Sequence, residues 1–258
     1  MTNPYKKHLD ELFSNLLEYK HTTQRFTTVL KKDAETYSKD EASFHSIAVL
    51  FISDWSGQTE NGWELPFPTG SIREIEKHNY HLEVEKIITR ECCLIYSQSF
   101  ECLEKNFKDF VFTKAKHKDH IDHAIKKSLR PGQKLTRKTV PGGDSLFKLI
   151  KLSGGNTFIE LSKKSNINLE FGTLWSILSE VRHSITHSRS MIEKSKINHS
   201  NYNIFKSLFR HSEINEDSFQ IEIDYKNLEQ LIKTISEFAF QIFKILSLEE
   251  NYEWQFKE

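Results

Sequence analysis

Apolar residues recur every three or four positions along most of the chain, which is the spacing that places them on one face of a helix. Near the N-terminus, for example, Leu9, Leu12 and Leu16 follow this spacing, and Leu228 and Leu231 begin a similar stripe near the C-terminus. The expected helices cover residues 5–32, 40–55, 72–112 with one break near 78–81, 144–152, 169–192, 202–209 and 225–248.

Residues 218–224 follow a different pattern, because Phe219, Ile221 and Ile223 alternate with polar residues as they would in a β-strand. Gly and Pro are scarce, with nine and five among 258 residues, and this favours helices over a turn-rich β architecture. We therefore expect an all-α helical bundle, with at most a short strand before the C-terminal helix.

Residues 56–70 contain three Gly and two Pro and interrupt the helical pattern, so they are the best candidate for an internal boundary. We expect an N-terminal helical segment, residues 1–68, followed by a helical bundle domain, residues 69–258. Two Gly pairs, at 142–143 and 154–155, bracket the expected helix at 144–152. They do not match a phosphate-binding loop, because no strand precedes them and no Gly-Lys-Ser/Thr ends them.

The three cysteines, Cys92, Cys93 and Cys102, lie within one helical stretch and form a poor disulfide framework, which fits a reducing compartment. The N-terminus lacks the apolar core of a signal peptide, and no window approaches the roughly 18 apolar residues of a membrane span. These features predict a cytoplasmic protein with no membrane partner.

The formal net charge is zero, with 36 basic and 36 acidic residues, but the charge is unevenly distributed. Residues 114–138 hold nine Lys or Arg against two Asp, a net charge of +7. This segment is expected either to bind an RNA backbone or to form an exposed linker without a partner. The candidate RNA-binding residues are Lys126, Lys127, Arg130, Lys134, Arg137 and Lys138.

His117, His120 and His123 recur at every third residue of the same segment, next to Asp119 and Asp122. Such side chains could supply metal ligands from successive helical turns. A solvated basic helix fits better, because three-residue spacing drifts around the helix and the neighbouring lysines repel a cation. We expect no metal site, and no motif points to a tetrapyrrole, flavin or nucleotide cofactor.

The residues with the clearest chemical potential lie near the end of the expected helix 169–192, where residues 180–188 read Glu-Val-Arg-His-Ser-Ile-Thr-His-Ser. On a helix, His183 and His187 share one face, whereas Arg182 lies at the edge of the apolar stripe. Arg182 and His187 are separated by roughly 140° around the helix, and a long Arg side chain can bend toward the His over a cleft. The alternative is an ordinary polar helix surface on which Arg182 is ion-paired, for example with Glu180.

These residue types suit the cleavage of RNA, in which the 2′-hydroxyl loses a proton, the 5′-oxygen gains one, and charge builds on the phosphate oxygens. A His titrates near neutral pH and serves as base or acid. An Arg stays protonated and offers a planar pair of donors to two phosphate oxygens. Cleavage by this route requires no metal ion.

The pattern Arg182-His183-x-x-x-His187 resembles the motif of the HEPN superfamily, in which an Arg is followed by a polar residue and then by a His at this spacing. Family members are helical bundles with the motif late in a core helix, followed by a short segment, often with a stub of strand, and a final apolar helix. The resemblance extends over residues 72–250 and leaves residues 1–68 without a counterpart. Some HEPN toxins carry a nucleotidylated Tyr two positions after the motif His, where this chain has Arg189.

The resemblance implies a metal-independent endoribonuclease that acts as a homodimer, with two motifs facing each other across a shared cleft. It implies that Arg182 binds the scissile phosphate, that His187 is the general acid or base, and that His183 orients the site. The products would carry 2′,3′-cyclic phosphate and 5′-hydroxyl ends.

The family recurs in phage defence, abortive infection and toxin–antitoxin systems. A toxic nuclease must be restrained, so we expect an inhibitor or activator protein. Because the net charge is zero, non-specific RNA affinity should be modest, and specificity would come from the shape of a folded RNA such as a tRNA or from an activator. The competing hypothesis is a non-catalytic helical module that binds RNA or a protein partner in a two-gene system. The apolar stripe of the last helix either packs within the chain or forms a subunit contact.

Overall fold

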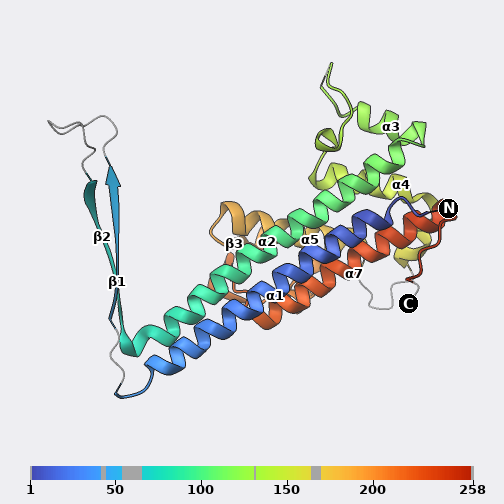
Figure 1. The fold of residues 1–258 in the computed structure, drawn as a ribbon. Helices are drawn as coiled ribbons and strands as arrows, with labels where there is room; N and C mark the ends of the chain where they lie inside the picture. Colours follow the sequence, from blue (N-terminus) through green and yellow to red (C-terminus); the bar gives the residue numbers. More distant parts are fainter. Residues whose placement is uncertain (1, 42–44, 54–65, 131, 164–169, 257–258) are drawn as a thin grey trace. The chain divides into compact units, whose positions relative to one another are not determined.

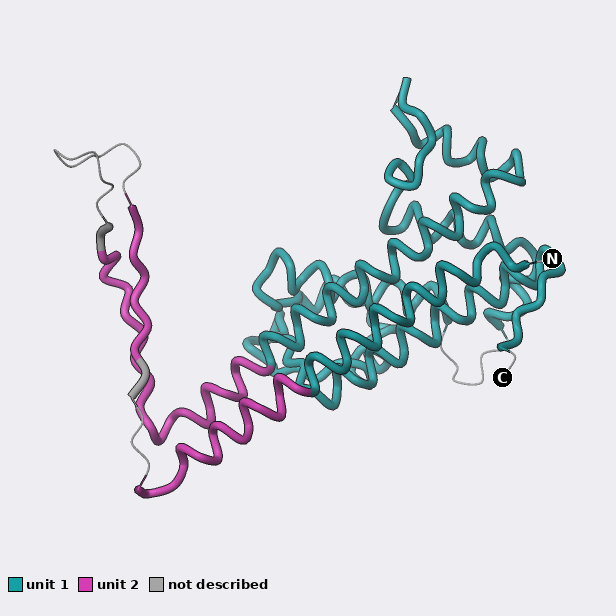
Figure 2. Tube along the Cα trace, in the orientation of Figure 1, with its two compact units in different colours: residues 1–24, 89–258 teal, residues 25–88 magenta. Residues whose placement is uncertain are grey.

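A computed structural model of the chain describes residues 2–41, 45–53, 66–130, 132–163 and 170–256 (Figure 1). These residues form seven α-helices and two small antiparallel sheets, so the described part of the chain is mostly helical. None of its helices is long and apolar enough to cross a membrane. The chain divides into two compact units, one of residues 1–24 and 89–258 and one of residues 25–88 (Figure 2).

Three long helices run side by side through the larger unit (Figure 1). They are α1 (Lys6–Tyr37), α2 (Tyr80–Ala115) and α7 (Tyr225–Glu249). An ion pair between Lys20 and Glu229, with 3.1 Å from Nζ to Oε1, links α1 to α7. A second pair, Lys105 with Glu11 at 2.8 Å, links α2 to α1. The C-terminal stripe therefore packs within the chain, where Ile235, like its neighbours on the stripe, is buried.

Three shorter helices complete the bundle: α3 (Asp119–Lys126), α4 (Gly143–Lys163) and α5 (Phe171–His187). The core joins α2, α4, α5 and α7 through aromatic side chains around Trp175, which is 1 % exposed. Its ring stacks on Phe107 and Phe147, with centroids 5.7 Å and 5.6 Å away, and Phe238 meets the Phe107 ring edge-on at 5.4 Å. Burial of four large aromatic side chains in one cluster is a major source of stability.

A three-stranded sheet is formed by residues that lie between α5 and α7 in the sequence, and its strand order is β3-β5-β4. Its strands are β3 (Met191–Glu193), β4 (His211–Asn215) and β5 (Ser218–Ile221), and α6 (Tyr202–Leu208) precedes β4. The strand expected at 218–224 is confirmed over residues 218–221, where Phe219 and Ile221 are buried. Ile192 lies in β3 and pairs with Phe219 of β5 instead of continuing α5, so the helix expected to reach residue 192 ends at His187.

The prediction of a helix over residues 40–55 is wrong, because residues 45–53 form a strand. Residues 54 and 55 lie outside the described residues. This strand, β1 (His45–Ser53), pairs with β2 (Pro66–Glu76), for example through Val49 opposite Ile72. Residues 66–70 of the expected loop therefore belong to β2, and the rest of that loop is outside the described residues. The expected helix from residue 72 begins only at Tyr80, after a short 3-10 turn at the predicted break.

The division into units does not follow the boundary expected after residue 68. The first turns of α1 belong to the bundle, because Leu9, Leu12 and Leu16 are at most 2 % exposed there, as is Tyr5 just before the helix. Burial of this amphipathic face therefore joins the start of α1 to the bundle.

Candidate functional site

Helix α5 ends at His187 because the chain turns into a left-handed conformation soon after it. The amides of Ser188 and Ser190 both donate to the carbonyl oxygen of Ser184, at 2.9 Å and 3.0 Å, and these two bonds close the end of the helix. Arg189 and Ser190 have φ angles of 53° and 64°, which are unusual for residues with a side chain. Gln220 of β5 donates to the Arg189 carbonyl at 3.1 Å, so the sheet holds the turn that follows the motif.

Arg182 forms an ion pair with Glu101 of α2, with 2.6 Å from Nη2 to Oε1. The Arg182 side chain is 26 % exposed and that of Glu101 is 53 % exposed, so solvent and ligands reach the pair. The Nε atom of Arg182 is buried and has no hydrogen-bond partner among the described residues. Glu180, the partner considered from the sequence, pairs instead with Lys196 at 3.9 Å.

Arg182 lines a groove of about 570 Å³ together with residues of α2 and of the segment after α3. Five cations and three carboxylates line this groove: Glu101, Glu104, Lys105, Lys108, Asp109, Arg137, Lys138 and Arg182. Glu104 and Lys108 pair at 2.9 Å, whereas Lys138 has no ion pair among the described residues. Lys105 is paired with Glu11, which does not line the groove, so the surplus positive charge is that of Lys138, and it favours an anionic ligand there.

His183 and His187 are exposed on one face of α5, as the sequence predicts, and their ring centroids are 4.7 Å apart. Neither lines the groove that contains Arg182. No hydrogen bond or ion pair joins Arg182 to either His among the described residues; its ion pair is to Glu101. The structure therefore brings the two histidines together but does not join them to the Arg within one chain.

The predicted RNA-binding residues separate into two groups. Arg137 and Lys138 line the groove of Arg182, whereas Lys126, Arg130 and Lys134 line a second pocket of about 710 Å³. The remaining residue, Lys127, is exposed and lines neither. Lys114, at the start of the basic segment, is 2 % exposed and pairs with Glu250 at 3.6 Å, so it is a buried structural residue.

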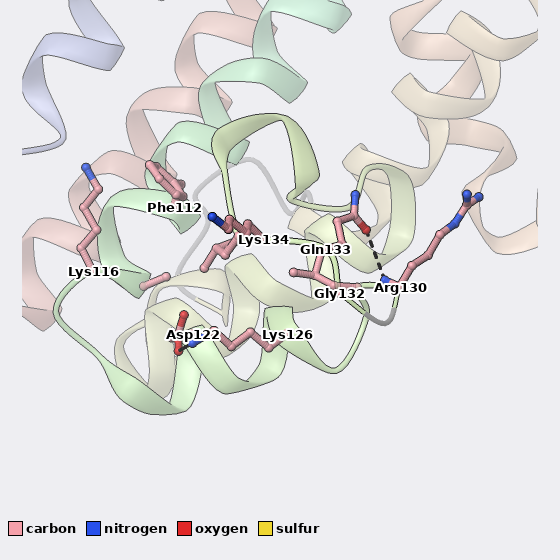
Figure 3. A pocket seen from close by; sticks show the side chains of 11 residues that line it. Phe112, Lys116, Asp122, Lys126, Arg130, Gly132, Gln133 and Lys134 are labelled. Carbon is pink, nitrogen blue, oxygen red and sulfur yellow. Dashed lines mark hydrogen bonds and ion pairs between the residues drawn. The ribbon is translucent and has the colours of Figure 1, made fainter.

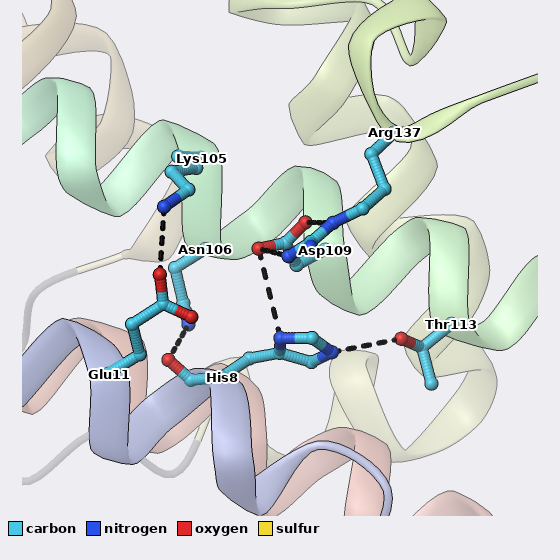
Figure 4. A network of polar contacts seen from close by, with 7 residues as sticks. All are labelled: His8, Glu11, Lys105, Asn106, Asp109, Thr113 and Arg137. Carbon is cyan, nitrogen blue, oxygen red and sulfur yellow. Dashed lines mark hydrogen bonds and ion pairs between the residues drawn. The ribbon is translucent and has the colours of Figure 1, made fainter.

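Arg137 also belongs to a polar network that the sequence did not reveal (Figure 4). Its Nε and Nη2 atoms contact the carboxylate of Asp109, which is 4 % exposed. Asp109 lies 3.7 Å from Nδ1 of His8, and Nε2 of His8 lies 3.3 Å from the Thr113 hydroxyl. Burial lowers the pKa of His8 below its ordinary value, although the nearby Asp109 acts in the opposite direction. Arg137 therefore has a structural partner, which limits its freedom to bind RNA.

The groove residues on α2 were also missed. Glu101, Lys105 and Lys108 follow the spacing of one helix face, and that spacing is readable in the sequence. What the sequence does not reveal is that Arg182, 81 residues away from Glu101, meets this face.

The described residues contain no group of three or more His, Cys, Asp or Glu side chains that could hold a metal ion. Cys92 and Cys93 are buried and Cys102 is half-buried, and all three are free thiols. Comparison of the chain with protein-family models, curated proteins and solved structures gives no match.

Proposed function

We propose that the chain is a metal-independent endoribonuclease of HEPN type that acts as a homodimer. The observation that carries the proposal is the position of Arg182, which joins Lys138 of the basic segment in one solvent-accessible groove with surplus positive charge. A guanidinium in such a groove is suited to bind the phosphate at which RNA is cut. The exposed His183 and His187 lie one and five residues further along the same helix.

In the proposed reaction His187 removes the proton of the 2′-hydroxyl or protonates the 5′-oxygen, and Arg182 stabilises the charge on the phosphate. In the absence of RNA the carboxylate of Glu101 is paired with the guanidinium of Arg182, and a phosphate of bound RNA would replace this carboxylate. Because the pair is half-exposed, little desolvation opposes this exchange. His183 would orient its neighbour, which it contacts ring to ring.

A non-catalytic module that binds RNA or a protein partner is the second candidate. The specific observation in its favour is that Arg182 is paired with Glu101 and makes no described bond to His187. It predicts RNA or protein binding without cleavage.

The deciding test is cleavage of total RNA in the presence of chelator, with end-group analysis of the products. The variants are Arg182→Ala and His187→Ala, and the matched controls are Arg90→Ala and His199→Ala, which remove an exposed Arg and an exposed His elsewhere. We expect cleavage to 2′,3′-cyclic phosphate ends, a loss of about 10²–10⁴-fold in the first two variants, and no loss in the controls. Absence of cleavage, or equal activity in all four variants, would leave the binding module.

A further inference from the structure

The second pocket combines an apolar floor with a basic rim (Figure 3). Its volume is about 710 Å³, and it lies between the end of α2, helix α3 and the segment that follows α3. The floor is apolar because Phe112, Ala115, Leu129 and Leu135 line it. Small-molecule sites commonly have this composition, with apolar walls and a few charged groups.

Four cations line the same pocket, but they are not equally free. Lys126 pairs with Asp122 at 2.6 Å, and in Figure 3 the guanidinium of Arg130 points away from the pocket. Lys116 and Lys134 have no ion pair among the described residues, and Nζ of Lys116 lies 4.8 Å from the centre of the Phe112 ring. Two ammonium groups without a described ion pair therefore lie beside the apolar floor, that of Lys116 over the Phe112 ring, so an anion and a flat apolar group could bind next to each other in this pocket.

We propose that this pocket binds one unpaired nucleotide of a single-stranded RNA, with the base against the apolar floor and the adjoining phosphates at Lys116 and Lys134. A base provides a flat apolar face that stacks or packs on such a floor, and its phosphates supply the negative charge. A duplex cannot fill the pocket, because its bases are stacked and paired inside the helix. The inference deepens the proposed function and rests on it for the identity of the polymer as RNA.

The position of the pocket relative to the Arg182 groove supports this assignment. Lys134 and Leu135 line the pocket, and Arg137 and Lys138 line the groove. The backbone from Lys134 to Lys138 spans at most ~14 Å, so one short strand crossing this segment reaches both sites. The nucleotide pocket would thus hold the RNA a short distance from the phosphate bound by Arg182.

The test measures the binding of a fluorescein-labelled, mixed-sequence 12-mer RNA in chelator, as a single strand and as a duplex, by fluorescence anisotropy. The double variant Lys116→Ala/Lys134→Ala removes the phosphate contacts, and Leu135→Gln removes apolar floor without changing charge. The matched control is Lys151→Ala/Lys226→Ala, which removes two exposed lysines outside the pocket. Thermal melting of each variant checks that the fold is retained.

We expect the single strand to bind at least tenfold more tightly than the duplex. The lysine variant should lower the slope of log affinity against log salt by about 1.4, as expected for two lost phosphate contacts to a single strand. Leu135→Gln should weaken single-strand binding several-fold, and the control should change neither quantity. Equal binding of the duplex, an unchanged affinity in Leu135→Gln, or an equal effect of the control would overturn the proposal.

Free nucleoside monophosphate and inorganic phosphate serve as competitors that separate the sources of the signal. Displacement of the RNA by the nucleotide but not by phosphate supports a binding site for the base, whereas equal displacement by both competitors overturns the proposal. If the pocket variants lose binding while no form of the protein cuts RNA, the nuclease proposal alone fails. If wild type cuts RNA and the pocket variants bind and cut as well as wild type, the pocket proposal alone fails.

Discussion

Replacement of Arg137 by Met tests whether the basic segment is anchored to the bundle by a buried carboxylate. Asp109 on α2 is 5 % exposed at its side chain and has the guanidinium of Arg137 as its ion-pair partner, with His8 at 3.7 Å. In the Arg137→Met variant the carboxylate stays buried but loses the two donors that stabilise its charge. The folded state is therefore destabilised, whereas the unfolded state, in which Asp109 is hydrated, is not.

The size of the effect follows from the exposure of the two partners. Loss of one partner from a fully buried ion pair costs about 3–5 kcal/mol. Because the Arg137 side chain is 48 % exposed, water replaces part of the lost interaction, and we take about half of this range, roughly 2 kcal/mol. For a chain of this length 1 kcal/mol corresponds to about 2–4 °C, so the melting temperature should fall by roughly 4–8 °C.

The assay is thermal unfolding followed by circular dichroism at neutral pH, with Lys138→Met as the matched control. Lys138 is the next residue, lies in the same groove and has no ion pair among the described residues, so its loss should cost at most about 0.5 kcal/mol. The double variant Asp109→Asn/Arg137→Met should recover part of the stability, because it leaves no unpaired charge buried. Equal melting temperatures for Arg137→Met and Lys138→Met would refute the reasoning.

Three further predictions concern single side chains. Burial lowers the pKa of His8, so the imidazole binds a proton less readily in the folded protein than in the unfolded chain. The free energy of unfolding should therefore fall as the pH drops below about 6.5, the ordinary pKa of His. In urea titrations, His8→Gln should reduce the difference in unfolding free energy between pH 7.5 and pH 5. A difference as large as in the wild type would show that His8 does not cause the fall. Glu101→Gln removes the anion that competes for Arg182, so RNA affinity should rise by about two- to fivefold in anisotropy titrations; weaker binding would indicate that Glu101 positions the Arg. Gly155 interrupts α4 with non-helical backbone angles of φ 50° and ψ −138°, so Gly155→Ala should cost about 1–3 kcal/mol in thermal unfolding. Gly172→Ala, within α5 and with its nearest neighbour 3.6 Å away, should cost nothing, and equal effects of the two substitutions would contradict strain at Gly155.

The long helices α1, α2 and α7 could be predicted because each carries its information locally, whereas the helix expected over residues 144–152 continues to Lys163. Helix α7 was expected over residues 225–248 and covers Tyr225–Glu249, since its apolar stripe is uninterrupted and Asp224 caps its first turn by accepting a hydrogen bond from the amide of Asn227 at 2.7 Å. The end of α5 was placed five residues too late. Ile192 fits the helical stripe, but the turn at Arg189 ends the helix first, and Ile192 pairs in β3 with Phe219 of β5.

The β1–β2 pair could not be derived in the same way. The run from Ile47 to Ile52 is apolar and short, and such runs fit a strand or a buried helix equally well by periodicity. The pairing partner of Val49 is Ile72, 23 residues away, and β2 contains two Pro and a Gly that resemble a loop. Strand pairing depends on residues distant in the sequence, whereas the helical stripe of α7 is complete within its own segment.

The candidate site shows the same limit. The motif supplies Arg182, His183 and His187 from six consecutive residues, and their sharing of one helix follows from spacing alone. Glu101 and Lys138, which share the groove with Arg182, come from segments 81 and 44 residues earlier in the sequence. The sequence suggests a chemistry for the motif, but only the fold reveals which carboxylate pairs with Arg182 and which cation lines the same groove.

The separation of Arg182 from His187 within one chain leads to a prediction about the dimer. If each active site takes its Arg from one protomer and its His from the other, the Arg182→Ala and His187→Ala proteins are each inactive alone but complement each other when mixed. After unfolding and refolding together, half of the dimers are mixed and each holds one intact site, so about a quarter of wild-type cleavage should return. A site built within one protomer would remain inactive in every combination. Light scattering on the same samples shows whether the 30.4 kDa chains have dimerised, so a lack of complementation in dimeric protein would exclude the shared site.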